Sequence, residues 1–350
     1  MKILVTGAAG FIGSAAVEKL VMEGNDVVGV DNINDYYSPS LKYDRLKALG
    51  IESGAEEWGK RVKSSKWPNF SFIRLDLTDS EKVKELFENE AFDRVVHLAA
   101  QPGVRYSIEN PRAYIENNVN GFLNILEGCR NTQVGHLVFA SSSSVYGLNG
   151  KVPFSEKDGT AHPVSLYAAT KKSNEMMAHS YSCVFGLPVT GLRFFTVYGP
   201  WGRPDMSPFL FIDAILNGRS IKVFNNGDMW RDFTYIDDIV EGISRIVNVI
   251  PEGRKDWNDQ LADPSSSTAP FRIYNIGNQK PTRLMDYIST IEKEIGREAE
   301  KEFLPMQPGD VYRTYADSSA LSLATGFTPG VTLADGIKNT VAWFRRYYRL

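Results

Sequence analysis

The chain has 350 residues, of which 43% are hydrophobic and 23% are charged, so it can bury a large core, and general disorder is excluded. Its 39 Lys and Arg against 42 Asp and Glu give a net charge of −3, which offers no overall field for nucleic acid or an anionic membrane. Two cysteines and four scattered histidines exclude a disulfide framework and show no metal-ligand spacing, so we expect no metal site.

Strand-like and helix-like segments alternate through the first half of the chain. The apolar patterns predict strands over 3–6, 26–30, 70–75, 94–98, 136–141 and 187–192, and helices over 11–23, 80–89, 112–130 and 165–185. Strands separated by helices indicate consecutive βαβ units with helices on both faces of a parallel sheet. We therefore predict an α/β fold with a Rossmann-type doubly wound parallel sheet.

The alternation becomes irregular after residue 192, which predicts a second part. A strand and helix over 231–250, a strand over 271–276 and helices over 282–295 and 333–348 follow, with loops over 50–67 and 251–270. We predict a Rossmann domain over 1–192, with returning segments near 231–250 and 271–278, and a smaller C-terminal α/β substrate lobe over 193–350. No apolar run approaches 18 residues, and a strand-like run follows Met1 directly. We therefore expect no membrane segment and a cytoplasmic protein.

A glycine-rich turn joins the first predicted strand to the first helix. Gly7, Gly10 and Gly13 allow a tight turn and close approach of a pyrophosphate to the backbone and to the helix N-terminus. Asp31 ends the second strand, where a carboxylate accepts hydrogen bonds from the ribose of NAD and repels the 2′-phosphate of NADP. The residues expected to bind NAD lie at this turn and at strand ends: Gly7, Gly10, Phe11, Ile12, Gly13, Asp31, Asn32, Asp76, Leu77, Leu98, Ala99 and Ala100.

Tyr167 and Lys171 lie four residues apart on one face of a predicted helix. A free Tyr has a pKa near 10, and a nearby ammonium together with an oxidised nicotinamide favours its phenolate. Serines 141–144 follow the fifth strand, where a hydroxyl can relay a substrate proton to the Tyr. Taken singly, the Tyr–Lys pair is compatible with a plain helix surface and the serine run with a linker. Together they predict a catalytic site in which Tyr167 and Lys171 also contact the cofactor.

These motifs together resemble the extended short-chain dehydrogenase/reductase family of nucleotide-sugar enzymes, over nearly the whole chain. Four longer segments, residues 31–37, 99–107, 196–206 and 229–235, are similar to the UDP-glucuronate 4-epimerase branch of that family. The resemblance implies reversible C4 epimerisation of UDP-glucuronate to UDP-galacturonate through a 4-keto intermediate, with NAD held tightly as a catalyst.

The resemblance also implies a role for individual residues. Tyr167 is the expected base, Lys171 its partner and Ser142 the catalytic hydroxyl, assisted by Ser141 and Ser143. Related dehydratases and decarboxylases carry acidic residues at the positions of Ser143 and Ser144, so the serines here favour simple epimerisation. The expected substrate contacts are Thr196 and Arg203 on the uronate carboxylate, Arg231 and Arg105 on the diphosphate, and Asp310 on the uridine ribose. A homodimer through the helices 112–130 and 165–185 is expected from the family.

Two other functions fit parts of the same pattern. One is a 4-epimerase for neutral UDP-sugars such as UDP-galactose or its N-acetyl form. Arg203 argues against it, because a buried cation near C6 would lack a partner beside a hydroxymethyl group. The other is a non-catalytic dinucleotide-sensing module, which fold alone does not exclude. The presence of Tyr167, Lys171 and Ser142 argues for an enzyme.

Overall fold

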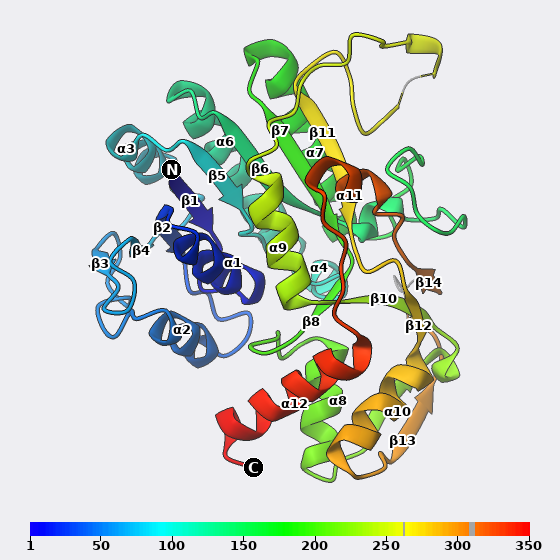
Figure 1. The fold of residues 1–350 in the computed structure, drawn as a ribbon. Helices are drawn as coiled ribbons and strands as arrows, with labels where there is room; N and C mark the ends of the chain where they lie inside the picture. The colour runs from blue at the N-terminus through cyan, green and yellow to red at the C-terminus, as the bar shows by residue number, and fades with distance from the viewer. Residues whose placement is uncertain (262, 308–311) are drawn as a thin grey trace.

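The protein is described by a computed structural model that covers residues 1–261, 263–307 and 312–350. An eight-stranded sheet forms its centre, in the order β11-β7-β6-β5-β1-β2-β4-β3 (Figure 1). Its strands are β1 (Lys2–Thr6), β2 (Asp26–Asp31), β3 (Arg61–Lys63), β4 (Phe70–Arg74), β5 (Arg94–His97), β6 (His136–Ser142), β7 (Val189–Phe194) and β11 (Phe271–Ile276). These strands pair in parallel, apart from β3, which runs antiparallel to β4.

The strand order reverses beside β1, which pairs in parallel with both β2 and β5. In an open α/β sheet such a switch point opens a crevice at the carboxyl ends of the strands, because the connections on its two sides leave in opposite directions. The sequence prediction of a Rossmann-type doubly wound parallel sheet is confirmed by this topology.

Helices cover both faces of the sheet, and alternating strand residues supply two separate cores. Ile3 and Val5 face one core with α1 and α9, whereas Leu4 faces the other with α3, α6 and α7. The helices before β7 are α1 (Phe11–Met22), α2 (Pro39–Ala48), α3 (Ser80–Glu90), α4 (Tyr106–Glu109), α5 (Pro111–Tyr114), the π-helix η1 (Ile115–Asn120), α6 (Gly121–Asn131), the 3-10 turn η2 (Ser143–Tyr146) and α7 (Leu166–Phe185).

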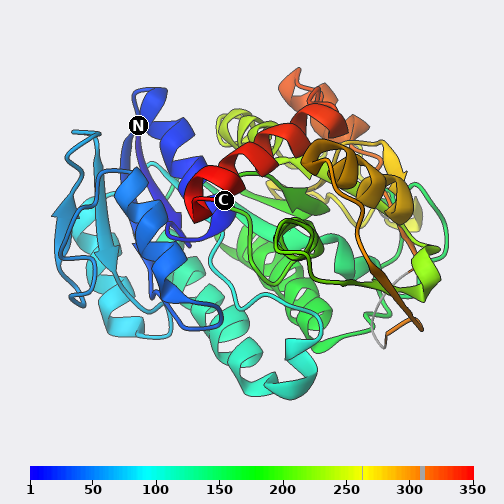
Figure 2. The ribbon, with the colours of Figure 1, turned by 90° about the horizontal axis from the view of Figure 1, so that it is seen from below.

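The rest of the chain builds a smaller part at the carboxyl ends of the strands (Figure 1). Its strands are β8 (Thr196–Tyr198), β9 (Ile221–Phe224), β10 (Trp230–Tyr235), β12 (Pro281–Arg283), β13 (Lys301–Leu304) and β14 (Arg313–Thr314). The helices and 3-10 turns after β7 are α8 (Ser207–Leu216), η3 (Asn225–Gly227), α9 (Ile236–Ile246), η4 (Asp259–Leu261), α10 (Leu284–Ile295), α11 (Ser319–Thr325) and α12 (Leu333–Tyr348); of these, α9 packs on α1 against the large sheet. Figure 2 shows α12 reaching back to the N-terminal half, where the Tyr347 hydroxyl donates to Asp44.

The elements differ from the sequence predictions in several places. The predicted helix 112–130 is divided into α5, η1 and α6, and the start of the predicted helix 282–295 lies in β12. The predicted loop 50–67 contains β3, and α2 was not predicted. Within the segment 231–250, α9 packs on α1 beside the large sheet, but β10 pairs with β8, β12 and β14 outside it. No helix in the described part of the chain is long and apolar enough to cross a bilayer.

Candidate active site

A cavity of about 1150 Å³ lies at the carboxyl ends of β1, β2, β5 and β6 and continues to α8, β9 and β10. Nearly all the residues singled out from the sequence line it: Gly7, Gly10, Phe11, Ile12, Gly13, Asp31, Asn32, Leu77, Leu98, Ala99, Ala100, Arg105, Ser141, Ser142, Ser143, Tyr167, Lys171, Thr196, Arg203 and Arg231. Asp76 lies just behind Asn32, and Asp310 falls outside the described residues. Segments far apart in the sequence therefore meet around one space.

The glycine turn at the start of α1 is built for close approach of a ligand to the backbone. Gly7 has φ +73, and a Cβ there would lie 2.9 Å from the Ala99 amide nitrogen. A Cβ on Gly13 would lie 1.9 Å from the Gly7 carbonyl oxygen, so neither position accepts a side chain. The turn leaves the N-terminal N–H groups of α1 directed at the cavity, which suits a pyrophosphate.

The end of β2 places a carboxylate beside that turn. Asp31 is 9% exposed, and its two oxygens accept hydrogen bonds from the amides of Ala9 (3.2 Å) and Ile33 (2.8 Å). Asn32 donates to Asp76 at 3.1 Å, so Asp76 orients Asn32. A fixed acceptor one strand away from a phosphate-binding turn matches the ribose and pyrophosphate of NAD, so the residues present fit this cofactor.

Tyr167 is the second residue of α7, whose first turn is capped by the Ser165 hydroxyl accepting from the Ala168 amide at 3.1 Å. Burial raises the pKa of Tyr167, while its hydrogen bond with Ser142 and the positive charge of Arg203 oppose that rise. The Tyr114 ring packs edge-on against the Tyr167 ring at 6.1 Å between centroids. The predicted base and hydroxyl are therefore in contact, and their phenol is held in place.

Lys171 lies one helical turn after Tyr167 and is 3% exposed. Its ammonium donates to the Ala140 carbonyl at 2.8 Å, and burial lowers its pKa to about 8. The sequence argument expected this ammonium to favour the Tyr167 phenolate. In the structure, burial raises the Tyr167 pKa, and the positive charge that opposes this rise is that of Arg203.

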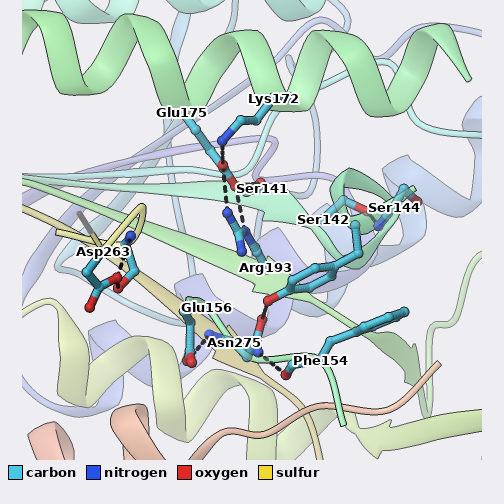
Figure 3. A network of polar contacts seen from close by, with 12 residues as sticks. Ser141, Ser142, Ser144, Phe154, Glu156, Lys172, Glu175, Arg193, Asp263 and Asn275 are labelled. Carbon is cyan, nitrogen blue, oxygen red and sulfur yellow. Dashed lines mark hydrogen bonds and ion pairs between the residues drawn. The ribbon is translucent and has the colours of Figure 1, made fainter. Parts of the chain in front are cut away.

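A buried ionic network joins the end of β6 to the middle of α7 and to β7 (Figure 3). Arg193 forms two hydrogen bonds to Glu175, at 2.8 and 2.9 Å, and the Ser141 hydroxyl donates to the same carboxylate at 2.7 Å. Burial raises the pKa of Glu175, but the charges of Arg193 and Lys172 and the hydrogen bonds from Arg193 and Ser141 together outweigh it, so the net pKa is lowered. Ser141 is thus engaged behind the cavity, whereas Ser142, the next residue, faces Tyr167.

The network extends from Arg193 to the second part of the chain. The Arg193 guanidinium lies 4.8 Å from the centre of the Tyr146 ring, and the Tyr146 hydroxyl donates to Asn275 Oδ1 at 2.6 Å (Figure 3). The Asn275 side-chain Nδ2 in turn donates to the Phe154 carbonyl, and the Asn275 backbone N–H donates to the Glu156 carboxylate. This chain of contacts fixes the turn after the serine segment.

Arg105, Arg203 and Arg231 line the same cavity. Arg203 pairs with Asp205, so the sequence expectation that this guanidinium would lack a partner beside a neutral sugar is wrong. Arg231 donates to the Trp230 and Tyr312 carbonyls, and Arg105 stacks on Phe224 at 4.7 Å. Thr196 begins β8 and lines this cavity too. These arginines can match the negative charges of a carboxylate at one point of the cavity and of a diphosphate at another.

Several residues of the site were not found from the sequence. Tyr36, Tyr106 and Tyr114 form a chain of ring contacts that ends at Tyr167. Asp205 and Glu175 are the carboxylate partners of the two arginines Arg203 and Arg193. The Arg–Pro–Asp spacing at 203–205 was a readable signal for one pair, but nothing local in the sequence links 175 with 193.

The comparison with known proteins matches this geometry. The sequence model of the NAD dependent epimerase/dehydratase family matches residues 3–277, which is well over half of the chain. The chain belongs to this family. Within it, the chain is 45% identical to a probable UDP-glucuronate 4-epimerase of Rhizobium meliloti (strain 1021), over 100% of this chain and 98% of that protein.

Solved structures of two epimerases resemble this family member over their full length. The UDP-glucuronic acid 4-epimerase of Bacillus cereus, in complex with UDP-glucuronic acid and NAD, has a TM-score of 0.84 and 33% identity, covering 99% of this chain and 100% of the other. The UDP-glucose 4-epimerase of Thermotoga maritima, with UDP-glucose, has a TM-score of 0.82 and 29% identity over 99% and 100% of the chains. The resemblance noted in the sequence is therefore confirmed.

Proposed function

We propose that this epimerase-family chain interconverts UDP-glucuronate and UDP-galacturonate by inverting C4 of the sugar, with NAD as a retained cofactor. The observation that carries the proposal is that Arg203 lines the same cavity as the Tyr167–Ser142 pair, close enough for its charge to oppose the rise in the Tyr167 pKa that burial causes. An arginine this near the base suits a sugar that carries a carboxylate next to the reacting part of its ring.

The chemistry divides between the chain and its cofactor. NAD, which the glycine turn and Asp31 would hold, would supply an acceptor for the hydride of C4 and a donor for its return to the other face of the sugar. Tyr167, as phenolate, removes the proton from the 4-hydroxyl, and Ser142 orients that hydroxyl. The 4-keto sugar then rotates within the cavity to present its other face, and Tyr167 gives the proton back to the C4 oxygen. The chain thus holds, orients and protects one ketone between two half-reactions.

The residues at the sugar end also explain why no other reaction is expected. Ser143 and Ser144 provide no carboxylate for elimination or decarboxylation. The 4-keto sugar is a β-keto acid, and it keeps its carboxylate only if the C5–C6 bond stays out of line with the carbonyl π system. Arg203, Thr196, Arg231 and Arg105 all line the cavity, and we propose that the first two hold that carboxylate and the last two bind the diphosphate.

Turnover on two substrates tests the proposal. Purified protein is incubated without added NAD, once with UDP-glucuronate and once with UDP-glucose, and the nucleotide sugars are separated by chromatography. We expect UDP-galacturonate as the main product and far slower conversion of UDP-glucose. Faster conversion of UDP-glucose would instead support the neutral-sugar epimerase, for which the resemblance to the Thermotoga maritima enzyme provides the specific precedent.

We further propose that two copies associate through the helices α6 and α7. These helices pack on each other and leave apolar side chains exposed, among them Met176 (49% exposed) and Leu123 (39% exposed). A second copy would cover these side chains by presenting the same helices. Sedimentation equilibrium should give twice the mass of one chain, and Met176→Glu should shift it towards the single-chain mass; a single-chain mass for the unaltered protein would refute the proposal.

A further inference from the structure

An ion pair inside the cavity fixes the guanidinium of Arg203. Its Nε donates to Asp205 Oδ1 at 3.0 Å and its Nη2 donates to Oδ2 at 2.5 Å, so the pair is bidentate. The two side chains are 23% and 28% exposed, and both line the cavity. A guanidinium has five N–H groups, and this pair uses two of them, which leaves the Nη1 amine outside the pair.

Tyr36 holds the same carboxylate through its Oδ2 atom. The Tyr36 hydroxyl donates to Asp205 Oδ2 at 3.0 Å, and its ring packs against Tyr106 with 5.0 Å between centroids. Gly103 leaves the space that this hydroxyl needs, because a Cβ there would lie 2.5 Å from it. Asp205 therefore has one oxygen shared between a phenol and a guanidinium, and it cannot rotate without breaking both contacts.

Asp205 and Tyr36 each keep a single protonation state near neutral pH. Burial would raise the pKa of Asp205, but the charge of Arg203 and the hydrogen bonds from Arg203 and Tyr36 outweigh it and lower the pKa. Burial and the charge of Asp205 raise the pKa of Tyr36 to about 12. Asp205 thus remains an acceptor and Tyr36 a donor near neutral pH.

We propose that Asp205, braced by Tyr36, is a positioning residue that fixes the orientation of Arg203, so that the N–H groups outside the pair hold the uronate carboxylate in one rotamer. This inference rests on the proposed function and deepens it. Because Arg203 already has an anionic partner, its charge alone does not reject a neutral sugar. Selectivity and protection of the carboxylate then depend on where the guanidinium points.

The chemical consequence concerns the 4-keto intermediate. If its carboxylate rotates, the C5–C6 bond can align with the C4 carbonyl and break. The electron pair of that bond moves into the C4–C5 bond and the carbonyl oxygen, CO₂ leaves, and the enolate takes up a proton at C5. The product is a UDP-4-keto-pentose. Return to C4 of the hydride that was removed from it in the first half-reaction would convert this product to a UDP-pentose. The share of turnovers that ends in pentose thus reports how firmly Arg203 is held.

Three variants test the proposal on the full-length protein with UDP-glucuronate as the probe. Asp205→Asn removes the charge of the brace at constant shape. Tyr36→Phe removes only the hydroxyl that supports it and leaves the ion pair in place. Asp256→Asn is the matched control, because Arg254 and Asp256 form the same bidentate pair two residues apart on an exposed loop. Products are separated as UDP-uronates, UDP-pentoses and UDP-4-keto-pentose.

We expect the pentose fraction, including the 4-keto form, to rise at least tenfold in Asp205→Asn and by a smaller factor in Tyr36→Phe, with no change in Asp256→Asn. A merely structural role would lower total turnover without changing this fraction. An unchanged fraction in either folded variant overturns the inference while leaving the epimerase function intact. If the unaltered protein makes no UDP-galacturonate, the proposed function fails, and this inference fails with it. If Asp205→Asn does not fold, Tyr36→Phe decides.

Discussion

At the scale of single residues, the chemistry depends on a phenol whose pKa is shifted in two directions. Burial favours the neutral form of Tyr167, while the hydrogen bond with Ser142 and the charge of Arg203 favour the phenolate. Because the residue proposed to bind the sugar carboxylate takes part in this balance, the proposal makes substrate recognition and base strength depend on one group. A carboxylate bound to Arg203 would weaken its effect on Tyr167.

The first prediction concerns Tyr167 itself. Tyr167→Phe removes the only atom that can take the proton from the 4-hydroxyl, so epimerisation should fall by at least 10³-fold, at the upper range of general-base catalysis. NAD content should remain as in the unaltered protein, measured by denaturing the protein and quantifying the released nucleotide. Ser165→Ala is a suitable comparison, since it removes the helix cap and keeps the phenol. Full activity in Tyr167→Phe would exclude the mechanism.

The second prediction follows from the buried ammonium of Lys171. Its pKa falls from 10.5 to about 8 on folding, so the unfolded chain binds this proton more tightly between those values. Burial of Lys171 therefore costs stability below pH 8, and the cost disappears as the pH rises towards 10.5. The size of the effect is on the order of 3 kcal/mol.

Comparison with Lys171→Met isolates this effect, because all other titrating groups are shared. Urea unfolding of both proteins, stripped of cofactor, is measured at pH 7 and at pH 10. The free energy of unfolding of the unaltered protein, relative to that of Lys171→Met, should increase from pH 7 to pH 10. A difference between the two that stays constant would show that Lys171 keeps its ordinary pKa.

At the scale of elements, the sequence predicted the strands better than the helices. The strands around the switch point are short apolar runs, so their positions follow directly from where those runs lie in the sequence. The predicted helix 112–130 contains η1, where Asn118 accepts from the Gln101 amide at 2.7 Å and donates to its carbonyl at 3.1 Å. That contact spans 17 residues and starts from within the π-helical segment, which hydrophobic periodicity cannot reveal. The irregularity anchors the strand-end loop that lines the cavity.

The same limit applies to the site. The glycine turn, Asp31 and the Tyr–Lys pair could be predicted, because each uses residue types whose local spacing is dictated by chemistry. The direction of the Ser141 hydroxyl could not, since it depends on Glu175, which is brought to β6 by the packing of α7. The domain boundary expected at 192 remains a prediction, although β11 completes the large sheet far beyond it.

The third prediction tests the buried pair that joins α7 to β7. Glu175→Gln leaves the Arg193 guanidinium, itself fully buried, without a charged partner. Breaking such a pair should cost about 3–5 kcal/mol in the free energy of unfolding. Lys172→Ala removes the outer, 20% exposed partner of the same carboxylate and should cost less than about 1 kcal/mol. Urea unfolding of both variants distinguishes the two, and equal losses would contradict the assignment.

At the scale of the whole molecule, one buried arginine connects the cofactor end of the cavity with the sugar end. Arg45 on α2 is 1% exposed and donates to the Ala9 carbonyl in the glycine turn at 3.1 Å. It also donates to the Trp201 carbonyl at 2.7 Å, two residues before Arg203, and to the Tyr37 hydroxyl at 2.7 Å. The two halves of the chain therefore share a fixed point directly behind the cavity.

The fourth prediction is that loss of this connection affects both ends together. Arg45→Met leaves buried carbonyls without donors, at about 1–3 kcal/mol each, and frees the segment that carries Arg203. In Arg45→Met, the NAD retained through gel filtration should fall, and the KM for UDP-glucuronate should rise at least tenfold. Arg45→Lys keeps the charge but not the planar fork, so both quantities should lie between those of the unaltered protein and those of Arg45→Met. Arg61→Met, on the outer strand β3, is the control and should change neither quantity. Because one guanidinium reaches both segments, a variant that lost NAD while keeping its KM, or the reverse, would show that the two ends are held independently.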